Sequence, residues 1–203
     1  MNDKFLIPAS NDSIQKAVAA LEKNGILSFV YETEEEVRKK IFELLPENAE
    51  VMTMSSVTLD TLGISDEITN SNNYNSVRKK LKALDMKTQW NEMRKLGSIA
   101  DYTIGSVHAV TENGEILIAS ATGSQIAAYA YGTGKAIFVV GTQKIVKDFQ
   151  EGLQRIREYT FPLENERAKK VYNMPSKIGK VLTIYSETPG RLTLLFLKKK
   201  IGF

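Results

Sequence analysis

The sequence predicts an α/β fold in which a mostly parallel sheet carries helices on both faces. Short apolar segments of strand length alternate with amphipathic segments of helix length. This alternation is typical of a parallel sheet, because each crossover between parallel strands usually passes through a helix. The chain has 203 residues, of which 42% are hydrophobic, enough to bury a sizeable core. We therefore expect a single domain over residues 1–203.

The N-terminal portion, residues 1–49, predicts a helix, a strand and a second helix. Residues 11–13 offer N-caps for the first helix, whose apolar side chains recur at helical spacing until Gly25 ends it. The short apolar segment 26–31 predicts a strand. The second helix has an acidic start and ends at Pro46.

The next part of the chain changes from apolar to polar. Residues 51–54 predict a buried strand that leads into a short helix toward Gly63. Residues 64–99 are polar and rich in Asn and Lys, with helical stretches around 77–84 and 91–96. We expect this segment to form a helical edge or lid beside the sheet.

Strand patterns return in the second half of the chain. They cover residues 102–104, 106–110, 116–118, 136–140, 181–185 and 192–197. A Gly-containing turn at 112–115 joins two of these strands into a hairpin. Helices are expected at 125–131, which is rich in Ala, and at 147–159. The crossovers between parallel strands should be right-handed.

Composition excludes several kinds of chemistry and partner. The chain has no Cys and one His, so it offers no disulfide, thiolate metal site, iron–sulfur ligand or cysteine nucleophile, and we expect no metal and no cofactor. The net charge of +3 comes from mixed signs, which argues against nucleic acid or an anionic membrane as partner. We see neither a signal-peptide pattern nor an apolar segment of membrane-spanning length, and expect a cytoplasmic protein.

Three loops that follow predicted strands carry side chains suited to an anionic ligand. In an open parallel sheet, ligands gather at the carboxyl ends of the strands, where helix N-termini present unpaired N–H groups. The candidate ligand-binding residues are Ser55, Ser56, Thr58, Thr122, Gly123, Ser124, Gln125 and Lys144. Helix caps, an ordinary turn and a solvated lysine explain the same residues without a ligand. Because the loops match neither a Walker motif nor a full GxGxxG, they predict general anion binding only.

His108 and Glu112 are the candidate catalytic residues. His108 is the single side chain that ordinarily titrates near neutrality, and it lies in a predicted strand. Glu112 begins the turn that follows and could act as a general base. A hydrogen-bonded structural histidine and an ordinary turn carboxylate are the alternatives. The clusters 162–167 and 187–191 each hold an acid and an Arg, which favours structural ion pairs.

Several motifs in a fixed order resemble a known family. They are MTMSSVTLDTLG, TENGE, TGSQ, VVGTQKIV and RIREY, in that order along the chain. The pattern is similar to that of the LUD, or lactate utilisation, domain family, and it spans about residues 50–203. The resemblance implies a fold like that of ribose-5-phosphate isomerase, glucosamine-phosphate deaminase and the CoA-transferases.

The resemblance also implies a function. Better-known members of the family are components of a bacterial system that oxidises L-lactate, and they work beside iron–sulfur partner proteins. Because this chain has no Cys, electron transfer would take place in a partner. Many relatives read Gly-Asn-Arg where this chain has Gly123, Ser124 and Gln125, so an anion-binding Arg is not carried over to Gln125.

Three functions remain open from the sequence. The first is a component of lactate or related 2-hydroxy-acid utilisation that acts with iron–sulfur partners. The second is a stand-alone enzyme for a small anionic metabolite such as a sugar phosphate or acyl-CoA, with Glu112 as base and Lys144 as anion clamp. The third is a binding or assembly subunit without catalysis. The sequence also leaves open whether the protein forms homo-oligomers.

Overall fold

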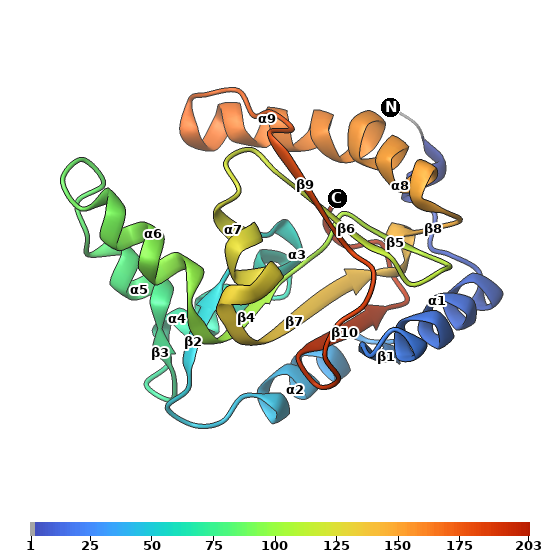
Figure 1. Ribbon diagram of the computed structural model, residues 1–203, viewed down its shortest axis with the longest axis horizontal. Coiled ribbons are helices and arrows are strands. Elements are labelled where there is room, and N and C mark those ends of the chain that lie inside the picture. Colours follow the sequence, from blue (N-terminus) through green and yellow to red (C-terminus); the bar gives the residue numbers. More distant parts are fainter. Residues whose placement is uncertain (1–2) are drawn as a thin grey trace.

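The computed structural model describes residues 3–203, which are arranged around two β-sheets (Figure 1). The larger sheet has the strand order β1-β10-β7-β4-β2-β3, and every pair in it is parallel. Its strands are β1 (Leu27–Tyr31), β2 (Glu50–Thr53), β3 (Asn75–Ser76), β4 (Ala100–Gly105), β7 (Thr133–Gly141) and β10 (Leu192–Leu197). The α/β class and the parallel sheet that the sequence predicts are confirmed.

Helices cover both faces of the larger sheet because the side chains of its central strands alternate between two cores. Phe138 and Val140 of β7 pack in the core that includes α1, whereas Ile137 and Val139 pack in the core that includes α2, α3 and α4. These helices are α1 (Asn11–Lys23), α2 (Glu34–Leu44), α3 (Val57–Thr61) and α4 (Ile64–Asn70). The central strands are apolar on both faces for this reason.

The first two helices begin at side-chain caps. The N-cap of α1 is Ser10, whose hydroxyl accepts a hydrogen bond from the Ser13 N–H at 3.2 Å. The expected caps at residues 11–13 are therefore wrong by one to three positions, because those residues already lie within the helix. Thr33 and Glu36 form a reciprocal capping box at the start of α2.

A second sheet, which the sequence does not distinguish from the first, has the order β8-β5-β6-β9. Its strands are β5 (Ala109–Thr111), β6 (Ile116–Ser120), β8 (Ile145–Val146) and β9 (Lys180–Ile184). β5 and β6 form the predicted antiparallel hairpin. The turn at residues 189–190 connects β9 to β10, which belong to different sheets.

A long helical segment packs against the smaller sheet. It consists of α8 (Phe149–Arg155), the π-helical turn η4 (Ile156–Thr160) and α9 (Phe161–Tyr172). The helix expected at 147–159 therefore continues for thirteen residues beyond its expected end (Tyr172 against residue 159). Pro162 does not end the helical segment, because it lies in the first turn of α9. An N–H group at this position would make no hydrogen bond within α9, so its absence costs α9 none.

The polar segment 64–99 forms one border of the molecule (Figure 1). It contains α4, the edge strand β3, α5 (Val77–Lys82) and α6 (Trp90–Ser98). β3 pairs with β2 at the end of the larger sheet, and α5 packs against β2. Side chains of α5 and α6 face the cavity described below.

Short helical turns complete the fold. They are η1 (Asp3–Leu6), α7 (Ser124–Ala127), the π-helical turn η2 (Ala128–Gly132) and η3 (Thr142–Lys144). Gly105 ends β4 where the Tyr129 ring of η2 crosses it, and a Cβ at this position would overlap the tyrosine hydroxyl. Within residues 3–203, no helix combines the length and the apolar character needed to span a membrane.

Candidate functional site

A cavity of about 1070 Å³ lies at the carboxyl ends of three neighbouring strands, β2, β4 and β7. Residues just beyond these strands form its floor, and α5, α6, α7 and α9 contribute its walls. This is the edge at which open parallel sheets bind ligands, because loops and helix N-termini converge there. The cavity has the size of a site for a cofactor-sized or drug-sized molecule.

The structure brings nearly all predicted site residues to this cavity. Its lining includes Ser55, Ser56, Thr58, His108, Thr122, Gly123, Ser124, Gln125 and Lys144. Glu112 lies elsewhere. Its carboxylate accepts a hydrogen bond from the Ser13 hydroxyl and lies 3.7 Å from the Lys16 ammonium, both on α1. The turn after β5 points toward α1, so it carries Glu112 away from the other candidates.

Capping accounts for only part of the hydroxyl groups in the two Ser- and Thr-rich loops. Ser56 occupies the N-cap position of α3 without a side-chain hydrogen bond to the helix. Thr122 accepts from the Ser124 N–H at 3.3 Å, and Ser120 accepts from the Gly123 N–H at 2.9 Å. Gly123 has φ +93°, a conformation that favours glycine. The loop at residues 122–125 is thus a turn held by side-chain hydrogen bonds, whereas the Ser56 hydroxyl makes no capping contact.

Three polar side chains meet at the floor of the cavity. The Lys144 Nζ lies 2.9 Å from the Ser106 Oγ and 3.2 Å from the Thr58 Oγ1, and the two hydroxyl oxygens are 3.4 Å apart. Only 1% of Lys144 is exposed. Burial, together with the nearby Arg155 guanidinium, holds the pKa of the Lys144 amine well below its usual value. The amine is therefore much more readily neutral than that of a surface lysine.

His108 lies beside this group in its neutral form. Its Nδ1 accepts a hydrogen bond from the Ala119 N–H at 3.1 Å, which leaves the ring proton on Nε2. Burial, together with the neighbouring Lys144 and Arg155, lowers the pKa of His108 to about 3. At neutral pH this imidazole can donate a hydrogen bond, but it carries no positive charge.

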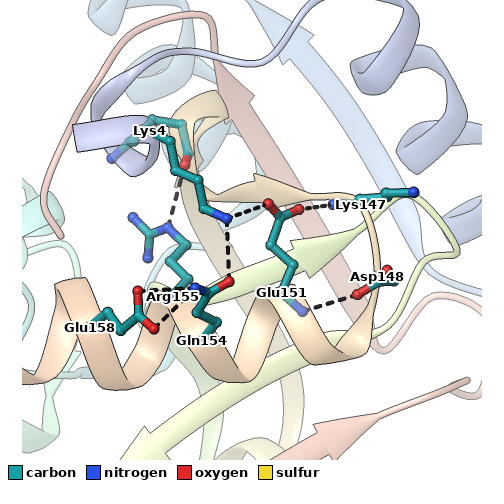
Figure 2. A network of polar contacts seen from close by, with 8 residues as sticks. Lys4, Lys147, Asp148, Glu151, Gln154, Arg155 and Glu158 are labelled. Atoms are coloured by element: carbon teal, nitrogen blue, oxygen red, sulfur yellow. Dashed lines mark hydrogen bonds and ion pairs between the residues drawn. The ribbon is translucent and has the colours of Figure 1, made fainter. Parts of the chain in front are cut away.

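Arg155 is a fully buried cation behind the floor. In Figure 2, Glu151 and Gln154 on the outer side of α8 contact Lys4, whereas Arg155 extends toward a backbone carbonyl. Its Nε donates to the Gln143 carbonyl at 3.4 Å, and its Nη1 donates to the His108 carbonyl and to the Thr160 hydroxyl at 3.0 Å. Its Nη2 has no hydrogen-bond partner among the described residues. Burial lowers the pKa of Arg155 to about 10.

The walls of the cavity are strongly basic. Within the described part of the chain, the basic residues of the lining are Arg78, Lys82, Arg94, Lys144, Arg167 and Lys177. One acidic residue, Glu164, lines it as well. Its carboxylate forms two hydrogen bonds with Arg167, at 2.7 and 2.8 Å. This is one of the structural ion pairs expected from the sequence. Among the described residues it leaves Arg78, Lys82, Arg94 and Lys177 without a carboxylate in the cavity wall.

Three important residues of the site, Ser106, Arg78 and Arg155, are not predicted from the sequence. Ser106 directly follows β4, so the rule that selected the other loops also applies to it. Arg78 lies on α5, and its side chain reaches the end of β2, where it donates to the Thr53 carbonyl and the Ser55 hydroxyl, both at 3.0 Å. Arg155 lies on an amphipathic helix, and the residues around it in the sequence do not mark it as part of the site. It reaches the site through hydrogen bonds to carbonyl groups of loops that precede it in the chain.

Comparison with known proteins decides the family. The LUD domain matches residues 14–197. The protein belongs to the LUD domain family. The match begins well before residue 50, so the family domain also includes most of the N-terminal helix α1, which the motif resemblance did not cover.

A solved structure supports the fold of this LUD domain. The crystal structure of a DUF162 family protein from Deinococcus radiodurans is similar, with a TM-score of 0.58 and 13% sequence identity. The alignment covers 94% of this chain and 99% of that chain. No curated protein matches the LUD domain described here. The comparisons therefore establish the family and the fold.

Proposed function

We propose that this LUD domain protein binds a small anionic metabolite in the cavity at the carboxyl ends of β2, β4 and β7. The observation that carries the proposal is the charge of the lining, which in the described residues has five basic side chains besides the buried Lys144, against one acidic side chain. The acid, Glu164, already pairs with Arg167. A concave surface with one sign of charge concentrates ligands of the opposite sign.

Arg78 is a cation of the cavity wall whose side chain is held in place by hydrogen bonds to neutral groups. Its Nε and Nη2 donate to the Thr53 carbonyl and the Ser55 hydroxyl, and these neutral acceptors fix the plane of the guanidinium without cancelling its charge. The remaining N–H groups can form paired hydrogen bonds to a phosphate or carboxylate. Arg78 therefore supports the proposed role of the Ser55–Ser56 loop.

Other polar groups of the cavity lining supply further donors. We assign hydrogen bonds to the ligand to the hydroxyl groups of Ser56 and Ser124 and to the backbone around Gly123, where glycine permits close approach. His108 contributes an Nε2–H donor. Its low pKa excludes a role as a proton donor in its imidazolium form near neutral pH.

The volume of the cavity favours a phosphorylated sugar or an acyl-CoA over lactate alone. A space of about 1070 Å³ is far larger than a three-carbon acid requires. Several of the basic residues, including Lys82, Arg94 and Lys177, lie on exposed parts of the walls. A ligand with more than one anionic group can contact these residues and Arg78 together.

Thermal unfolding in the presence of ribose 5-phosphate, acetyl-CoA and L-lactate tests the proposal. A ligand that binds only the folded protein raises the midpoint by about 5–10 °C at a hundredfold excess over Kd in a chain of this size. We expect ribose 5-phosphate or acetyl-CoA to give the larger shift. An unchanged midpoint with all three ligands contradicts anion binding, and a shift with L-lactate alone contradicts the inference from cavity size.

Family membership favours a second, more specific proposal. The chain would act as a cytoplasmic component of lactate or related 2-hydroxy-acid utilisation, together with an iron–sulfur partner protein. Because this chain has no Cys, thiolate-held clusters would lie in that partner. Affinity purification from cells grown on L-lactate, with assays for iron and acid-labile sulfide, should recover an iron–sulfur protein in stoichiometric amount. Purification without iron and sulfide contradicts this assignment.

A further inference from the structure

We propose that Ser106 and Lys144 form a nucleophile and base that act on an ester or thioester. The substrate class is an acyl group joined to an anionic carrier. This inference rests on the proposed function, because the basic walls would hold the carrier. It goes beyond that function because it names a reaction and a nucleophile.

The geometry at the cavity floor carries the inference. The Ser106 Oγ lies 2.9 Å from the Lys144 Nζ, which is direct hydrogen-bond distance. The Thr58 Oγ1 lies 3.2 Å from the same nitrogen and fixes its position. A hydroxyl, a base within hydrogen-bond reach and a third group that orients the base together make up the recurrent arrangement of an activated nucleophile.

The surroundings of Lys144 suit a base rather than a fixed charge. Lys144 is 1% exposed, and the contacts of its Nζ in the described structure are the hydroxyls of Thr58 and Ser106. The neighbouring cation Arg155 opposes its protonation. A neutral amine has a lone pair that can accept the Ser106 proton while its N–H groups donate to Thr58.

Ser106 has the exposure that a nucleophile needs. Its side chain is partly exposed and lines the cavity, whereas Lys144 is buried. The Ser106 Oγ also lies 2.7 Å from the Val139 carbonyl oxygen. The single hydroxyl proton can therefore point to the Val139 carbonyl in the resting state and turn to Lys144 when a substrate is bound.

The reaction balances without any group beyond water. The Ser106 Oγ attacks the acyl carbon, and its proton passes to the Lys144 Nζ. The bond from the acyl carbon to the carrier oxygen or sulfur breaks, and Lys144 returns the proton to that atom. Water then attacks the acyl-serine ester while Lys144 accepts a proton from it. The bond from the acyl carbon to the Ser106 Oγ breaks, and Lys144 returns the proton to that oxygen. The products are a carboxylic acid and the free carrier alcohol or thiol.

An alkyl fluorophosphonate tests the nucleophile directly, because an activated serine displaces fluoride and forms a stable O–P bond. We expect wild-type protein to gain one label, located on Ser106 by peptide mass spectrometry. The S106A variant should remain unlabelled, whereas S186A, which removes an exposed hydroxyl outside the cavity, should label as wild type does. A wild-type protein without label on Ser106 overturns the inference.

Lys144→Arg tests the base. Arginine is positively charged and cannot accept the proton near neutral pH, so the labelling rate should fall roughly 10²–10⁴-fold. The wild-type rate should rise with pH and level off below pH 10.5, the ordinary lysine value, and the variant should lose this plateau. A Lys144→Arg protein that folds, by circular dichroism, and labels at the wild-type rate contradicts the assignment of Lys144.

A thermal shift with inorganic pyrophosphate separates this inference from the proposed function. A shift in wild-type protein without labelling of Ser106 retains the anion site and overturns the nucleophile. Labelling of Ser106 without a shift supports the nucleophile and overturns the anion site. Should both variants fail to fold, the label position and the pH profile of the wild-type protein decide the matter.

Discussion

We expect the Phe138→Ala substitution to lower the free energy of unfolding by about 3–5 kcal/mol. Phe138 lies in the middle of β7 and is fully buried. Its ring meets the Tyr129 ring edge-on, with centroids 4.7 Å apart. The substitution removes apolar burial and this aromatic contact and leaves a cavity that neighbouring strands cannot close.

Chemical denaturation of the variant measures this effect. A typical domain has a total stability of about 5–15 kcal/mol, so the expected loss is a large part of it. Tyr131→Ala is the matched control, because Tyr131 is an aromatic residue that is 90% exposed, and it should change stability by about 0.5 kcal/mol or less. Similar small losses in both variants contradict the central position of β7 in the core.

Acid should destabilise the protein through His108. The pKa of this group is about 3 in the folded protein and 6.5 as its ordinary value. Between these values the unfolded chain binds a proton that the folded protein excludes. The contribution of His108 to the free energy of unfolding is therefore fully present above pH 6.5. It is lost as the pH decreases toward 3, by up to about 1.4 kcal/mol per pH unit.

Two measurements check the His108 prediction. The chain has a single histidine, so the NMR titration of its ring protons should show no transition between pH 5 and 8. The variant His108→Asn keeps an acceptor for the Ala119 N–H and removes the titrating group, so its stability should fall less between pH 7 and 4 than that of the wild type. A ring titration near pH 6.5 contradicts the neutral state of His108 in the folded protein.

Much of the fold follows from local pattern, and the rest depends on long-range pairing. Alternating strand and helix segments predict the parallel sheet because each segment buries its own apolar face. The separate sheet of β5, β6, β8 and β9 was not predicted, because the apolar alternation of a strand does not say which sheet it joins. α9 was missed because Pro162 usually marks a boundary, although in this chain it stands at a permitted first-turn position.

The part of the site that lies directly after strands was predicted from the sequence. The loop at residues 55–58 and Lys144 converge because they follow β2 and β7, parallel strands that end at one edge of the larger sheet, whereas the loop at residues 122–125 follows β6 of the smaller sheet. Glu112 was expected beside them, but the direction of a hairpin turn is not encoded in its residue types, and it pairs with α1. Arg78 reaches the cavity from α5, a contact that only the packing of the polar segment creates.

Titration of inorganic pyrophosphate into Arg78→Gln protein tests the anion site most directly. Arg78 lines the cavity, whereas Lys79, its neighbour on α5, is exposed and does not. Hydrogen bonds to a charged group contribute about 1.5–3 kcal/mol, so calorimetry should show Kd raised about 10- to 150-fold in Arg78→Gln and unchanged in Lys79→Gln. Equal affinity of wild type and Arg78→Gln, or the same loss in both variants, contradicts binding of the anion in this cavity.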